Sequence, residues 1–245
     1  MTYVHQSDHV TETARSRSMR TRRSRAAEPA AILPAMPREV EKASPADQRR
    51  AGFLLVLGMA ALMWVEEIVD QATGGGLDQY GIKPRETDGL VGIVTSPFLH
   101  SGFGHLLSNT VPFVAMGLAI ALAGLIRVLS VTAIVMVIGG LGTWLIAPDH
   151  TNHIGASGVV FGYATYLLVR GFFDRSALEL LIGLVVGAIW GTALLSSLLP
   201  HEGISWQGHL FGGIGGVVAA RVLARRRGDR DGAEPDRRAA RARLT

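Results

Sequence analysis

Residues 153–163 read HIGASGVVFGY, and the apolar run that they open continues to residue 173. Ser157 stands between glycines at the start of this run, with Gly158 and Gly162 four positions apart. Small residues at this spacing allow two membrane helices to approach closely. Polar groups inside a membrane are costly and are therefore functional candidates. The stretch predicts a membrane helix over 156–173 with a serine at one end.

Five other runs have the same apolar character, and they cover residues 51–69, 104–123, 126–147, 177–199 and 205–224. About 20 residues suffice for one helical crossing of a bilayer. The sequence therefore predicts an all-α, polytopic membrane protein, a bundle of six transmembrane helices in a domain at 51–224. Residues 1–50 and 225–245 are rich in charge and poor in apolar residues, so we expect two disordered tails.

The positive charge predicts the orientation of this domain. All but Lys83 and Arg85 of the 24 lysines and arginines lie in the tails, or in connections and segment ends on the same side of a six-helix protein. Because positive residues stay in the cytoplasm, we expect both termini there, in the plasma membrane of a bacterium. The arginine-rich tails favour contact with anionic membrane lipids, and we predict no nucleic-acid partner.

In this orientation three segments enter from the outer face, and each carries polar residues near its start. The first brings His105 and Asn109, the second Ser157, and the third His209. Each residue alone has an ordinary explanation: a serine bonds back to its own helix, an asparagine joins helices, and a histidine lies among headgroups. Their occurrence together at matched depth predicts a site.

Serine and histidine are the pair that acyl transfer requires. A serine hydroxyl becomes a nucleophile when a base accepts its proton, and histidine is the usual base. The side chains of His105 and Asn109 and the Ser157 N–H are candidate donors to an oxyanion. No Asp or Glu lies at this depth on the three segments that enter from the outer face. We therefore predict a dyad of Ser157 and His209, without an acid, a metal or a cofactor.

Glycines indicate how the dyad would form. Gly158 and Gly162 on one segment, and Gly212 and Gly216 on the other, predict close packing that brings Ser157 to His209. Phe161, one turn below Ser157, is placed to lie against the His209 ring, although core packing is the more common role of a phenylalanine.

Two external stretches complete the pattern. Residues 70–103 are too apolar for a linker, and we expect them to pack on the bundle or to enter the outer leaflet. Asp149, His150 and His153, in PDHTNH, have a spacing compatible with a divalent cation. A polar loop is the favoured interpretation of this second stretch, and we predict no metal there.

Three motifs together resemble the rhomboid intramembrane serine proteases: HLLSN from His105 to Asn109, GASG from Gly155 to Gly158, and GHLFGGIGG around His209. The resemblance implies that Ser157 is the nucleophile and His209 the general base. It assigns the oxyanion site to His105, Asn109 and the Ser157 N–H, with Gly155 and Phe161 in support.

The resemblance further implies hydrolysis of single-pass or polytopic transmembrane substrates near the outer leaflet. Residues 70–103 would be the family's first loop, and residues 200–205 a flexible cap. The Trp-Arg pair frequent in that loop is missing, and PRETDG stands nearest to it.

Two other functions are compatible with a bundle of this kind. An inactive rhomboid-like protein would bind membrane clients without cleaving them, but the presence of both Ser157 and His209 argues against it. A small transporter would more often carry charges near the midplane or inverted repeats, and the sequence shows neither.

Overall fold

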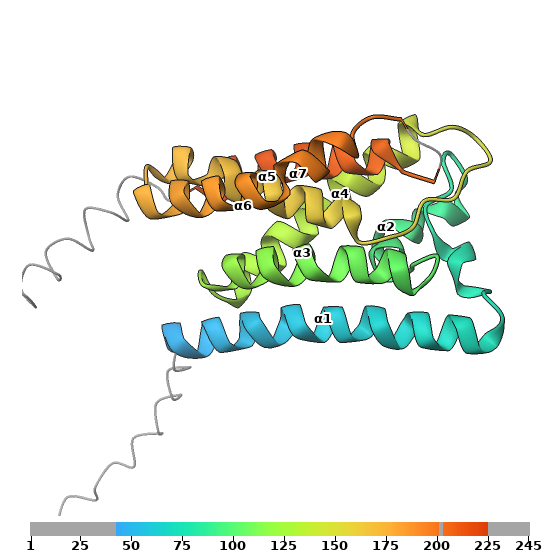
Figure 1. Ribbon diagram of the computed structural model, residues 1–245, viewed down its shortest axis with the longest axis horizontal. Helices are drawn as coiled ribbons and strands as arrows, with labels where there is room; N and C mark the ends of the chain where they lie inside the picture. The colour runs from blue at the N-terminus through green and yellow to red at the C-terminus, as the bar shows by residue number, and fades with distance from the viewer. Residues whose placement is uncertain (1–42, 201–202, 225–245) are drawn as a thin grey trace, which may run out of the picture. The chain divides into compact units, whose positions relative to one another are not determined.

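The computed structural model describes residues 43–200 and 203–224, and these residues form an all-helical domain (Figure 1). Its elements are α1 (Pro45–Thr73), η1 (Leu77–Tyr80), η2 (Asp88–Leu90), α2 (Gly92–Thr95), η3 (Ser96–Phe98), α3 (Phe103–Ala121), α4 (Leu125–Ile146), α5 (Ser157–Asp174), α6 (Ala177–Ser196) and α7 (Trp206–Val222). Six of these are long helices at the six predicted apolar segments.

The first helix begins earlier than the sequence analysis placed it. Ser44 caps α1, because its hydroxyl accepts a hydrogen bond from the Asp47 N–H at 3.1 Å, and Pro45 occupies the first turn. Both features favour helix initiation. Residues 45–50 therefore belong to the helix and not to the predicted tail at 1–50. Residues 1–42 and 225–245 lie outside the described residues, so their predicted disorder stays a prediction.

Helix α5 lies at the centre of the packing and contacts α3, α4, α6 and α7. Its two fully buried tyrosines fill the core: the Tyr163 ring stacks on Phe113 of α3 at 5.5 Å, and its hydroxyl bonds to Thr132 of α4 at 2.5 Å. Since protein surrounds α5 on most sides, its sequence is less apolar than that of a helix facing lipid.

Glycines bring α5 and α7 into backbone contact. A methyl group at Gly212 would overlap the Gly158 carbonyl, and one at Gly216 would overlap the Gly162 carbonyl. A methyl group at Gly162 would overlap Val135 of α4, whereas one at Gly158 would lie 3.2 Å from the Gly208 oxygen. The short distance between the axes of α5 and α7 therefore requires that these positions carry no side chain.

Among the described helices, four are long and apolar enough to cross a membrane: α1, α3, α4 and α6. Helix α7 has only 17 residues, and α5 is the central, less apolar helix. Large apolar side chains cover the outer surface of α6, where Leu178, Leu184 and Leu195 are each more than 60% exposed. Such a surface is costly in water and ordinary in lipid.

The segment between α1 and α3 is folded against the other helices. Ile82 and His153 form an isolated antiparallel bridge with backbone bonds of 2.9 and 3.0 Å. The Arg85 guanidinium bonds to Asp149 and to the Leu145 carbonyl, and the Trp144 indole donates to the Glu86 carbonyl at 2.9 Å. The loop before α5 and the end of α4 thus hold this segment in place.

Candidate active site

Ser157 and His209 meet at the N-terminal ends of α5 and α7. Ser157 is the first residue of α5, and His209 lies in the first turn of α7. The distance between Ser157 Oγ and His209 Nε2 is 2.9 Å, which is a normal hydrogen bond. The glycine contacts described above bring the two helices close enough for this bond.

The second ring nitrogen of His209 fixes the direction of that bond. His209 Nδ1 lies 2.8 Å from the Ser197 carbonyl oxygen, at the end of α6. A carbonyl only accepts, so Nδ1 carries the proton and the unprotonated Nε2 accepts the hydroxyl hydrogen of Ser157. The Phe161 ring stacks on the imidazole at 4.2 Å and 7° and restricts its rotation.

The chain before Ser157 is held from two sides. The Gly155 N–H donates to the Ser96 carbonyl at 2.8 Å, and the Ala156 N–H faces His100 Nε2 at 3.4 Å. Gly155 has φ +108° and lies against the His105 ring, so a side chain at this position would meet both backbone strain and a collision. No described residue accepts a hydrogen bond from the Ser157 N–H, because this group lies in the first turn of α5, where N–H groups have no helical carbonyl as partner.

His105 and Asn109 lie on α3, opposite this turn. His105 Nδ1 is 3.5 Å from the Ser101 N–H, so Nε2 carries the hydrogen and faces Gly155. Asn109 donates one amide hydrogen to the His105 carbonyl at 3.1 Å, and the second amide hydrogen remains available to a substrate. The structure thus brings every predicted polar residue of the site to one region.

A cavity of about 680 Å³ opens at this region. It is lined by the site residues His105, Asn109, Ser157, Phe161 and His209, by Trp190 and Leu194 of α6, and by Gly203 to Ser205 of the predicted cap. His201 and Glu202 of that cap lie outside the described residues. Pockets of this size hold substantial organic groups.

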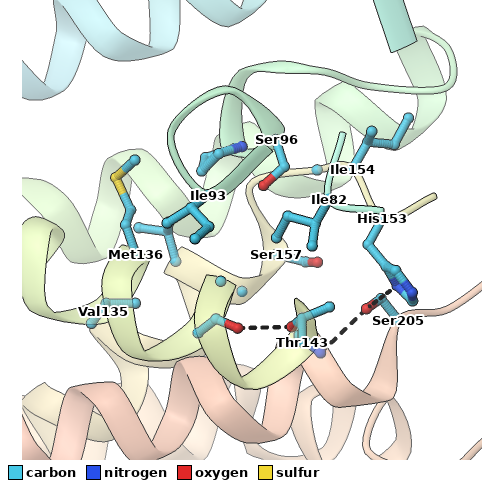
Figure 2. A pocket seen from close by; sticks show the side chains of 17 residues that line it. Ile82, Ile93, Ser96, Val135, Met136, Thr143, His153, Ile154, Ser157 and Ser205 are labelled. Carbon is cyan, nitrogen blue, oxygen red and sulfur yellow. Dashed lines mark hydrogen bonds between the residues drawn. The ribbon is translucent and has the colours of Figure 1, made fainter. Parts of the chain in front are cut away.

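A second, smaller cavity of about 50 Å³ also borders Ser157. Figure 2 shows its wall, which includes the side chains of Ile82, Ile93 and Ile154 and the hydroxyls of Ser96, Thr143 and Ser205. Ser157 and His153 border both cavities. Ser157 therefore borders both the large and the small cavity.

The sequence did not predict two groups that contact the site, the Ser197 carbonyl and His100. The Ser197 carbonyl has no signature in a sequence, because every residue carries one. His100, which the sequence shows only as a neighbour of HLLSN, is fully buried and supports the Ala156 N–H. Burial, assisted by the nearby His105, lowers the pKa of His100 to about 4, so this ring is neutral at neutral pH.

Two of the three candidate metal ligands in PDHTNH, Asp149 and His153, make hydrogen bonds to other parts of the protein. Asp149 pairs with Arg85, and the His153 ring bonds to two hydroxyls. Among residues 43–200 and 203–224, no three histidines or carboxylates are grouped as metal ligands.

Comparison with known proteins agrees with the geometry. The model of the rhomboid domain matches residues 87–226, more than half of the chain. An uncharacterized protein of Mycobacterium tuberculosis is 45% identical over 181 residues, which are 71% of this chain and 75% of its own. A Mycobacterium leprae relative, also uncharacterized, is 43% identical over 182 residues, covering 71% and 72% of the two chains. YdcA of Bacillus subtilis, named as a candidate rhomboid protease, is 31% identical over 127 residues, covering 51% and 63%. Together with its apolar helices, these matches show a multi-pass integral membrane protein, and the chain belongs to the rhomboid family.

Proposed function

We propose that the chain is an intramembrane serine endopeptidase that cleaves transmembrane substrates with a Ser157–His209 dyad. The observation that carries the proposal is the bond of 2.9 Å between Ser157 Oγ and the unprotonated Nε2 of His209. This is the arrangement in which a histidine activates a serine. The Ser197 carbonyl takes the place that a carboxylate has in a triad.

The reaction follows from these contacts in two steps. Ser157 Oγ attacks the carbonyl carbon of the scissile bond while His209 Nε2 accepts the hydroxyl proton. His209 then gives this proton to the departing amine, which leaves an ester between Ser157 and the substrate. In the second step His209 deprotonates a water molecule that hydrolyses the ester, and the proton returns to Ser157 Oγ.

The negative oxygen of each tetrahedral intermediate needs hydrogen-bond donors. His105 Nε2 and Asn109 Nδ2 lie 2.8 and 3.8 Å from the position that a Cβ on Gly155 would take, and the Ser157 N–H is the third candidate donor. One preorganised donor of this kind typically contributes a factor of about 10² to 10³ in rate. The 680 Å³ cavity leaves room for the substrate backbone and for water.

The proposal includes six crossings of the bacterial plasma membrane with both termini in the cytoplasm. The dyad then lies near the outer leaflet, at the ends of α5 and α7. Substrates are single-pass or polytopic membrane proteins, and local unwinding of their helices would expose the bond to Ser157. No nucleic acid or cofactor takes part.

The proposal is tested with the protein in proteoliposomes and a fluorogenic single-pass substrate. We expect cleavage by wild type and none by Ser157→Ala or His209→Ala, and a fluorophosphonate should label wild type at Ser157. A wild type that binds the substrate and releases no product would instead support the inactive client-binding protein. Cleavage by Ser157→Ala at the wild-type rate would exclude the serine mechanism.

A further inference from the structure

The His153 ring lies between two hydroxyls at the outer end of the domain. His153 Nδ1 is 2.7 Å from Ser205 Oγ, and Nε2 is 2.8 Å from Thr151 Oγ1. Figure 2 shows the ring beside Ser205, on the wall of the smaller cavity. Neither the proposed reaction nor a metal site explains these contacts.

The hydrogen bonds around this ring are satisfied in one consistent arrangement. Ser205 Oγ accepts from the Gly208 N–H at 3.2 Å and gives its own hydrogen to His153 Nδ1. His153 Nε2 then carries the ring proton and donates to Thr151, whose hydroxyl donates to the Pro148 carbonyl at 2.6 Å. Burial lowers the pKa of His153, which favours this neutral form.

Both ends of the contact lead to the dyad. The His153 backbone is fixed by its bridge to Ile82, and the chain reaches Ser157 four residues later. Ser205 is the N-cap of α7, and its carbonyl accepts the His209 N–H at 3.1 Å. The Ser205–His153 bond is therefore a lateral connection between the beginning of α7 and the chain that leads into α5.

We propose that His153 is a positioning residue, which holds the Ser205 cap so that His209 stays within bonding distance of Ser157. The glycine contacts determine how closely α5 and α7 pack, whereas the cap determines where α7 begins and how its first turn is rotated. Without the bond, Ser205 loses an acceptor and the first turn of α7 frays more easily. This inference rests on the proposed protease function for its kinetic consequence only.

The test combines His153→Leu, which removes both bonds, with His153→Asn, whose amide oxygen takes the place of Nδ1. His150→Asn is the matched control, because His150 is exposed in the same loop and asparagine tolerates its φ of +62°. Hydrogen exchange of the Gly208 and His209 amides in detergent measures fraying without catalysis. Cleavage in proteoliposomes gives kcat and KM.

We expect the exchange to rise about fivefold in His153→Leu, the scale of a lost cap. The kcat of His153→Leu should fall at least tenfold, while its KM stays within twofold of the wild-type value. His153→Asn should restore most of the wild-type exchange rate and most of the wild-type kcat. The double variant His153→Leu/Ser205→Ala should exchange no faster than Ser205→Ala alone. His150→Asn should match wild type.

Unchanged exchange in His153→Leu would overturn the inference, as would a His153→Asn that behaves like His153→Leu. If His153→Leu fails to fold, the other two variants decide. The Gly208 and His209 amides must then exchange at the wild-type rate in His153→Asn and faster than in wild type in Ser205→Ala. A wild type without any cleavage would refute the proposed function, while the exchange measurements would still decide the role of His153.

Discussion

Replacing Gly212 by alanine tests whether backbone contact between α5 and α7 forms the dyad. The added Cβ would lie 2.9 Å from the Gly158 carbonyl carbon and closer still to its oxygen. Nonbonded carbon atoms prefer about 3.5 to 4.0 Å, so the helices must separate by roughly 1 Å. That shift would lengthen the Ser157–His209 bond from 2.9 Å to a distance at which it no longer forms.

The expected result is a large loss of rate with a moderate loss of stability. General-base catalysis contributes a factor of about 10² to 10⁴, and we expect kcat of Gly212→Ala to fall by about that much. Overpacking of this kind typically costs about 1 to 3 kcal/mol of unfolding free energy. Rates are measured in proteoliposomes, per folded molecule, with thermal unfolding in detergent as the measure of stability.

Gly213→Ala is the matched control on the same helix. A Cβ at Gly213 would lie 3.4 Å from Thr165 Cγ2, an ordinary contact, so this variant should keep the wild-type rate and unfold at or above the wild-type temperature. Turnover and stability of Gly212→Ala equal to those of Gly213→Ala would refute the reasoning that glycine contacts set the geometry of the dyad.

Three further predictions concern single side chains of the site. Phe161→Leu should reduce kcat about tenfold in the cleavage assay, because an aromatic stack of this type contributes roughly 0.5 to 1.5 kcal/mol; an unchanged kcat would mean that the ring only fills space. Asn109→Ala should reduce kcat by about 10² to 10³ with little change in thermal stability, as the loss of one oxyanion donor does, and equal rates would remove Asn109 from the site. His100 has its pKa lowered to about 4, so the folded protein binds fewer protons than the unfolded chain between pH 4 and 6.5, and stability falls as the pH falls through this range. At pH 5 this amounts to about 2 kcal/mol, so melting curves at pH 7 and pH 5 should show a larger loss for wild type than for His100→Gln; parallel losses would contradict this.

The helices were readable from the sequence because lipid imposes one simple requirement on them. A crossing segment must be about 20 residues long and apolar. Each of the six predicted segments is a helix with ends within a few residues, and four of the described helices are long and apolar enough to cross a membrane. The exception is the start of α1, which hydropathy does not predict because residues 45–50 are mostly polar. The correct signal there was local, since SPAD offers a serine cap followed by a proline.

The segment between α1 and α3 was predictable only in outline. Its apolar residues indicated packing against the bundle, but its path depends on bonds between distant residues. Trp144 is 58 positions from the Glu86 carbonyl that accepts its hydrogen, and Arg85 is 64 positions from Asp149. No local pattern relates such residues, so Arg85 and Trp144 could be assigned no partners from the sequence.

The candidate residues themselves were readable because four polar side chains occur together at matched depth in apolar segments, where such groups are costly. Their environment was not, since it is largely made of backbone groups. The Ser197 carbonyl, the Ala156 N–H and the Ser157 N–H each take part in the site, and the residue type decides none of these contacts. The sequence thus predicts the reacting groups, and the fold supplies the groups that orient them.

The use of a carbonyl in place of an acid has a structural consequence for the dyad. The Ser197 carbonyl belongs to the end of α6, a helix of which only Gly183 and Val186 are buried. If the C-terminal end of α6 moves away, His209 Nδ1 loses its acceptor, and the imidazole no longer favours the tautomer that accepts the Ser157 proton. A carboxylate on α7 itself would keep that tautomer wherever α6 lay. In this chain, the basicity of His209 towards Ser157 therefore depends on the position of a neighbouring, lightly packed helix.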